Sequence, residues 1–201
     1  MAETTEAMHR ADRALVRVMS VVAGLIAIGS LVIGVGQALF QLDDDDAAVS
    51  LLVQSTLEVE SPAVISAVAD SATVLARLGD TRWLFAAGAL LGALTTALIA
   101  GAIAVALHRI AAGQPFHRIM TVAAVTCGAA LTIGGLLTTA VGGFAQMVAA
   151  DQLNGGPDGG GPFVVGFVFE PGPWLAGFAI LALTAVFHSG ARLQRDTEGL
   201  V

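Results

Sequence analysis

Four long apolar stretches constrain the fold of this chain more than any motif in it does. They occupy residues 18–40, 83–107, 119–149 and 173–190. A helix needs about 20 apolar residues to cross the hydrocarbon core of a bilayer, and each stretch comes near or exceeds that length. Hydrophobic residues make up 56% of the 201, charged residues only 12%, and the mean hydropathy is +0.81. We therefore predict an all-α membrane protein with a four-helix transmembrane bundle, forming a single membrane domain over residues 1–201.

The first stretch could be mistaken for a secretory signal peptide. Its apolar core is too long, and no small-x-small cleavage site precedes the acidic block Asp43–Asp46. We interpret the stretch as a retained helix and the four adjacent carboxylates as the point where the chain leaves the membrane. A cation site is the weaker interpretation of this block, because its residues lack the spacing of a calcium loop.

The charges indicate which way round the protein sits. Four spans put both termini and the turn at 108–118 on one side, and the loops at 41–82 and 150–172 on the other. The first side carries seven of the nine arginines, and the two outer loops carry eleven of the sixteen carboxylates. The positive-inside rule then predicts a multi-pass protein of the cell (cytoplasmic) membrane with both termini in the cytoplasm.

The two outer loops predict a small extracytoplasmic cap. Residues 49–59 partly alternate between apolar and polar, and residues 163–170 are rich in β-branched and aromatic side chains, so we expect two short strands that pair. Ser61-Pro62 resembles a helix start. Val64, Ile65, Val68, Leu75 and Leu78 would share one side of a helix, which predicts an amphipathic helix at about 62–78.

Small residues recur every four positions along two spans. Gly88 and Gly92 begin one such stripe, and Gly134 and Gly142 lie on another. Small stripes let helices approach closely in membranes. We predict that they pack the helices of one chain together, with homo-oligomer formation as the alternative.

The cytoplasmic turn and the end of the last span carry the remaining candidate site. The residues of this candidate docking surface are Arg109, Pro115, Phe116, Arg118, Arg192 and Arg195. One interpretation is that the arginines attract anionic lipid headgroups. The other is that they bind a cytoplasmic regulatory protein.

The residue pattern favours no catalytic chemistry. His9, His108, His117 and His188 all fall on the predicted cytoplasmic side, but their spacing matches no metal motif. Cys127 has no positioned base in its own span. The spans contain almost no ionisable residue, which disfavours a coupled transporter. We predict no enzyme activity, no cofactor, no metal and no direct nucleic-acid partner.

Two segments resemble one known family. Gly113-Gln114-Pro115-Phe116 is similar to a G-x-P-F turn between the middle helices, and the ending Ala185–Val201 is similar to the family's C-terminus. With four spans in about 200 residues, the chain resembles the uncharacterised bacterial membrane family called domain of unknown function 2975. His117-Arg118-Ile119-Met120 departs from the family, many members of which have an Asn here. The resemblance implies this topology, often beside small helix-turn-helix regulators, and implies no chemistry.

These observations lead to one expected role and one alternative. We expect a non-enzymatic regulatory or sensory partner that is embedded in the lipid bilayer and acts through its cytoplasmic face. The alternative is a small transport or permeation component, which would need a continuous polar path between the helices. The sequence does not identify the signal, ligand or substrate.

Overall fold

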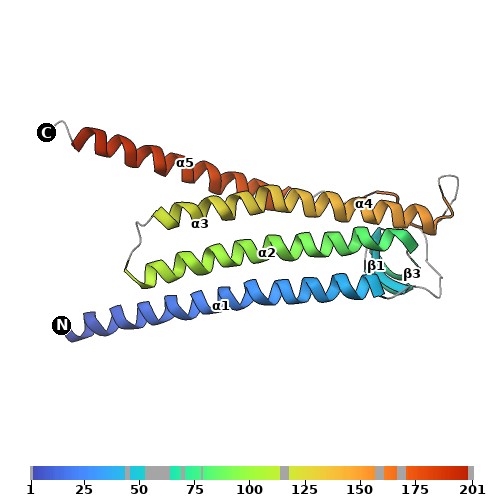
Figure 1. Cartoon of the computed structure of the whole chain (residues 1–201), viewed down its shortest axis with the longest axis horizontal. Coiled ribbons are helices and arrows are strands. Elements are labelled where there is room, and N and C mark those ends of the chain that lie inside the picture. Colours follow the sequence, from blue (N-terminus) through green and yellow to red (C-terminus); the bar gives the residue numbers. More distant parts are fainter. Residues whose placement is uncertain are drawn as a thin grey trace. The chain divides into compact units, whose positions relative to one another are not determined.

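The computed structural model of the chain is mostly helical. It describes residues 2–43, 46–52, 64–68, 71–77, 79–113, 118–156, 161–166 and 171–198. Its α-helices are α1 (Ala2–Asp43), α2 (Arg82–Ala111), α3 (Arg118–Ala129), α4 (Gly135–Leu153) and α5 (Gly172–Glu198). Three strands lie between α1 and α2 in the sequence, β1 (Asp46–Leu52), β2 (Val64–Val68) and β3 (Ser71–Arg77), followed by the 3-10 turn η1 (Gly79–Thr81) (Figure 1).

Three helical segments are long and apolar enough to cross a membrane, which confirms three of the predicted spans as helices of spanning length. They are Ala14–Asp43, Arg82–Ala111 and Ile119–Leu153. Their large side chains are widely exposed, as Leu25 (64%) and Val32 (66%) show. Apolar surface of this extent is typical of helices that a membrane or another protein covers. The first helix starts well before residue 18, because residues 2–17 contain no proline or glycine to end it.

The third span contains a π-helical turn that the sequence did not predict. This turn, η2 (Ala130–Gly134), separates α3 from α4, and the backbone N–H of Gly135 is directed at the carbonyl oxygens of Ala130, Leu131 and Thr132. The hydroxyl of Thr132 donates to the carbonyl oxygen of Gly128 at 2.8 Å. Such turns arise where one extra residue enters an α-helix. The residues after the turn therefore present a different face of the helix from the one that an unbroken α-helix would present.

The fourth predicted span corresponds to α5. This helix has 27 residues, and its described apolar part is Gly172–Val186, which is shorter than a full crossing. The four-helix bundle and its orientation therefore stay predictions.

The chain divides into two compact units. Unit 1 comprises Met1–Val32, Ala93–Leu136 and Pro171–Val201, and unit 2 comprises Ile33–Gly92 and Leu137–Glu170. Helices α1 and α2 each contribute residues to both units. This division does not test the prediction of a single membrane domain over residues 1–201, which stays a prediction.

The helices of unit 1 pack closely at glycines, where a larger side chain would not fit. A Cβ at Gly177 of α5 would lie 2.8 Å from the carbonyl oxygen of Gly128, and one at Gly128 would lie 2.7 Å from Leu181 Cγ. A Cβ at Gly134 would lie 2.8 Å from Thr95 Cγ2 of α2. Gly128 of α3 thus packs against α5, and Gly134, the last residue of the π-helical turn, packs against Thr95 of α2.

The segment predicted as an amphipathic helix at 62–78 is instead two strands, so that prediction was wrong. Strands β2 and β3 pair antiparallel, and β3 also pairs with β1, giving the order β1-β3-β2. The segment's β-branched residues favour strands. Its apolar positions fit both a helical and a strand period, and the pairing of β3 with β1 and β2 decides in favour of strands.

The predicted partners of the first strand also need correction. Strand β1 begins before residue 49 and pairs with β3, with Val49 opposite Val74. The segment at 163–170, predicted as the partner strand, contributes one backbone hydrogen bond to β1. It runs from the Val164 N–H to the carbonyl oxygen of Leu52 at 2.9 Å. Residues 53–59 and 167–170 lie outside the described residues.

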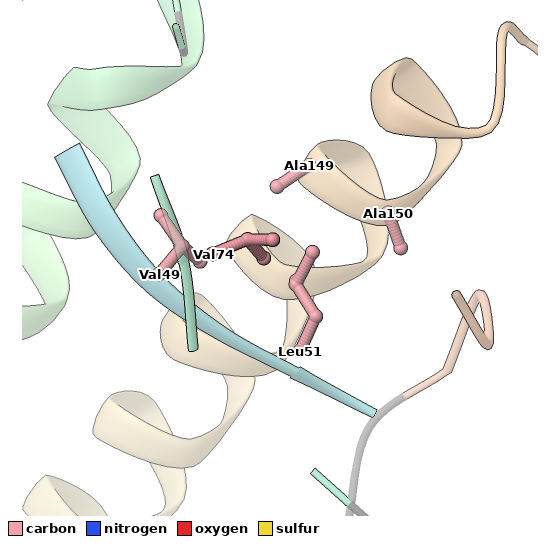
Figure 2. Close-up of a cluster of buried hydrophobic side chains, with 5 residues drawn as sticks. All are labelled: Val49, Leu51, Val74, Ala149 and Ala150. Carbon is pink, nitrogen blue, oxygen red and sulfur yellow. The ribbon is translucent and has the colours of Figure 1, made fainter. Parts of the chain in front are cut away.

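The small sheet packs on α4. Val49, Leu51 and Val74 point from the strands toward Ala149 and Ala150 of the helix (Figure 2). Leu51 is 1% exposed and Val74 2%. The alanines allow the sheet to lie close to the helix, while the strands supply the larger side chains. We call the three strands and residues 161–166 the β cap.

In unit 2, α2 and α4 approach through their small residues. A Cβ at Gly88 would lie 3.7 Å from Gly142 Cα, and one at Gly92 would lie 3.4 Å from Thr138 Cγ2. These are ordinary van der Waals contacts, so alanine would fit here more readily than at Gly177.

We expect Gly177→Ala to destabilise the attachment of α5. Its Cβ would meet backbone atoms, which cannot move aside cheaply, and overpacking of this kind costs roughly 1–3 kcal/mol. The measurement is thermal unfolding in mild detergent, followed by circular dichroism. Gly101→Ala is the control, because nothing lies within 4 Å of its added Cβ. Equal unfolding temperatures for the two variants would contradict this account of the contact.

Candidate functional site

The structure describes only part of the candidate docking surface. Arg109 lies half-buried in the last turn of α2. Arg118 begins α3, and Arg192 and Arg195 lie in α5, but the side chains of all three are outside the described part. Pro115 and Phe116 lie outside the described residues. Whether these six residues form one surface therefore stays a prediction.

Helix α2 ends just before the basic turn. The N–H of Gly113 donates to the carbonyl oxygen of Ile110 at 3.0 Å, and Gly113 has a φ of 75°. This left-handed conformation strains residues with a Cβ, so glycine is favoured as the residue that redirects the chain. His108 is exposed beside Arg109 in the last turn.

The candidate chemical groups do not form a described site. Among the described residues, no group of three or more His, Cys, Asp or Glu side chains could hold a metal ion. Of the four histidines, only His108 has a described side chain, so convergence of the histidines is untested. Cys127 Sγ lies 3.7 Å from the carbonyl oxygen of Ile99 and donates to it, which joins α3 to α2 in unit 1.

Polar contacts that the sequence did not reveal join the helix ends beside the β cap. Gln152, near the end of α4, donates from Nε2 to Thr81 Oγ1 at 2.9 Å. Thr81 is 5% exposed and directly precedes α2. This hydrogen bond joins the start of α2 to the end of α4 within unit 2.

Asn154 fastens the loop that follows α4. Its Nδ2 donates to the carbonyl oxygen of Phe163 at 2.7 Å, and its Oδ1 accepts from the N–H of Phe163 at 3.2 Å. Gly155 and Gly156 follow with φ values of 85° and 93°. An Asn-Gly-Gly run after a helix is a turn signal, so the turn was predictable from sequence, whereas the partner of Asn154 was not.

Together these contacts make the β cap a continuous part of unit 2. Phe163 packs against the cluster around Leu51 and Val74, as does Phe85 of α2. Val164 is hydrogen bonded to Leu52. The β cap therefore contacts the start of α2 through Phe85 and the end of α4 through Ala149, Ala150 and Asn154.

We expect Asn154→Ala to release residues 161–166 from the end of α4. The substitution leaves a backbone N–H and a carbonyl without this partner, at a cost of about 1–3 kcal/mol if they stay buried. Hydrogen–deuterium exchange of the Phe163 and Val164 amides measures the release. Asn154→Asp keeps an acceptor for the Phe163 N–H and should give an intermediate rate. Unchanged exchange in the alanine variant would show that the asparagine does not hold the loop.

No family model, curated protein or solved structure matches this chain. The resemblance to the family called domain of unknown function 2975 therefore stays a prediction, and any function must be argued from the chain itself.

Proposed function

We propose that this protein is a four-span integral membrane protein that acts without catalysis, as a regulatory or sensory partner in the cell membrane. In this proposal its termini and the 108–118 turn are cytoplasmic and its β cap is extracytoplasmic. Three helices of spanning length support the proposal. The distribution of arginines and carboxylates supports the orientation.

The observation that carries the proposal is the packing of the β cap against Phe85 of α2, a helix that ends in basic residues. Thr81, bonded to Gln152, directly precedes α2, and α2 has His108 and Arg109 in its last turn. A ligand or stress that moved the β cap would shift the start of a helix whose other end belongs to the candidate docking surface. A packed helix transmits such a displacement because it is stiff along its axis.

The transport alternative has less support. The larger of the grooves described in unit 1 is lined by apolar side chains, with Thr96 as its single polar residue. The sequence has no carboxylate between residues 13 and 42 or between 81 and 150. Coupled transporters place ionisable groups at membrane depth, where they bind ions or protons.

The test is capture of partners from gently solubilised native membranes, with identification by mass spectrometry. The triple variant Arg109→Ala, Phe116→Ala, Arg192→Ala should lose a cytoplasmic partner that the unchanged protein retains. The matched control is Arg77→Ala, Arg82→Ala, Trp83→Ala, which removes two arginines and one aromatic residue from the opposite side.

The control variant should retain the partner. If the unchanged protein and the triple variant retain the same proteins, or none, the proposed docking surface is wrong. Loss of the partner in both variants would point to unfolding, which circular dichroism of the two preparations would reveal.

A further inference from the structure

An apolar groove runs between α1 and α2 in unit 1. It has a volume of about 460 Å³, and each helix contributes five lining residues. Val22 and Ile26 of α1 line it and are about half exposed, at 48% and 52%. Ile103 of α2, 42% exposed, lines it opposite them. The groove is therefore open at the surface that the membrane would cover.

The groove is as long as one leaflet of a bilayer is deep. Along α2 it extends from Thr96 to Leu107, which at about 1.5 Å per residue is roughly 16 Å. Half of the hydrocarbon thickness is about 15 Å. A groove of this length along a spanning helix can hold one extended acyl chain. The chain would extend from its own carboxyl end, near the membrane surface, to near the bilayer midplane.

One end of the groove is basic. Ser20 Oγ donates to the carbonyl oxygen of Ala104 at 2.9 Å, and Ser30 Oγ to that of Ala93 at 3.5 Å, so α1 and α2 are antiparallel here. Three residues beyond the Ser20 contact, Arg17 comes level with Leu107. Arg17 is exposed, and His108 and Arg109 directly follow Leu107.

We propose that this groove binds an anionic phospholipid, with one acyl chain between α1 and α2 and the phosphate beside Arg17 and the end of α2. The apolar lining matches the chain, the length matches one leaflet, and the positive end matches the phosphate. Basic sites at the membrane surface between helices suit anionic headgroups. The proposal requires insertion in a membrane but neither the orientation nor the regulatory role proposed above.

A second copy of this chain fits the groove less well than a lipid does. In a two-fold symmetric pair about the membrane normal, the same patch of each copy faces the other. The arginines at the end of the groove would then face like charges at the same depth.

The test is native mass spectrometry of the full chain in lipid nanodiscs containing equal parts phosphatidylglycerol and phosphatidylcholine with identical acyl chains. The unchanged protein should retain one phosphatidylglycerol in preference to phosphatidylcholine. Arg17→Gln should reduce this preference about five-fold, as expected for one arginine near the membrane surface. Val22→Trp should reduce retention of both lipids, because its ring would occupy the groove.

Two matched controls separate this groove from general attraction to the membrane. Arg82→Gln removes an arginine at the start of α2, and Val122→Trp adds the same ring to the other groove described in unit 1, between α2 and α3. Both should retain the lipid as the unchanged protein does.

Three results would overturn the proposal. The first is equal retention of the two lipids by the unchanged protein. The second is an equal loss in Arg17→Gln and Arg82→Gln. The third is a dimer that carries no lipid and dissociates in Val22→Trp, which would assign the groove to a second copy. Arg17→Gln changes an exposed residue, so it decides the question even if Val22→Trp does not fold.

Discussion

The apolar surface of the helices is the constraint on which the other features of this structure depend. A bilayer offers the backbone no hydrogen-bond partners, so each span must be a helix that satisfies its own amides. It also removes the hydrophobic force between helices, and close contact between small residues takes its place. Gly177 against Gly128 in unit 1 and Gly88 against Gly142 in unit 2 are contacts of this kind.

Several polar side chains in the described helices bond to main-chain carbonyls. Thr132 and Thr184 bond to carbonyl oxygens four residues earlier, while Ser20 and Cys127 bond to carbonyls of α2. Such bonds satisfy a hydroxyl or thiol in an apolar solvent and hold neighbouring helices in register. At the end of the third span, the β cap uses ordinary core packing, with Leu51 and Val74 against Ala149 and Ala150 of α4.

The sequence predicted the long helices well because spanning length and hydropathy are local properties. It failed at residues 62–78, where the same apolar positions fit a helix face or two short strands and only pairing with β1 decides. Periodicity could not reveal the π-helical turn, which lies within a continuous apolar run, or the contact of Asn154 with Phe163, which lies in an irregular loop nine residues further on. For the docking surface, the sequence indicated six candidate residues. The structure positions Arg109 but leaves the side chains of Arg118, Arg192 and Arg195 undescribed.

Cysteine accessibility in intact cells tests most directly whether this chain crosses the membrane as proposed. Single cysteines would be placed by Ala112→Cys, Val165→Cys and Gln194→Cys in a Cys127→Ala background and treated with a membrane-impermeant maleimide. We expect labelling at Val165→Cys in intact cells, and labelling at the other two positions only after permeabilisation. The same accessibility at all three positions would contradict a chain that crosses the membrane between the basic turn, the β cap and the C-terminal end.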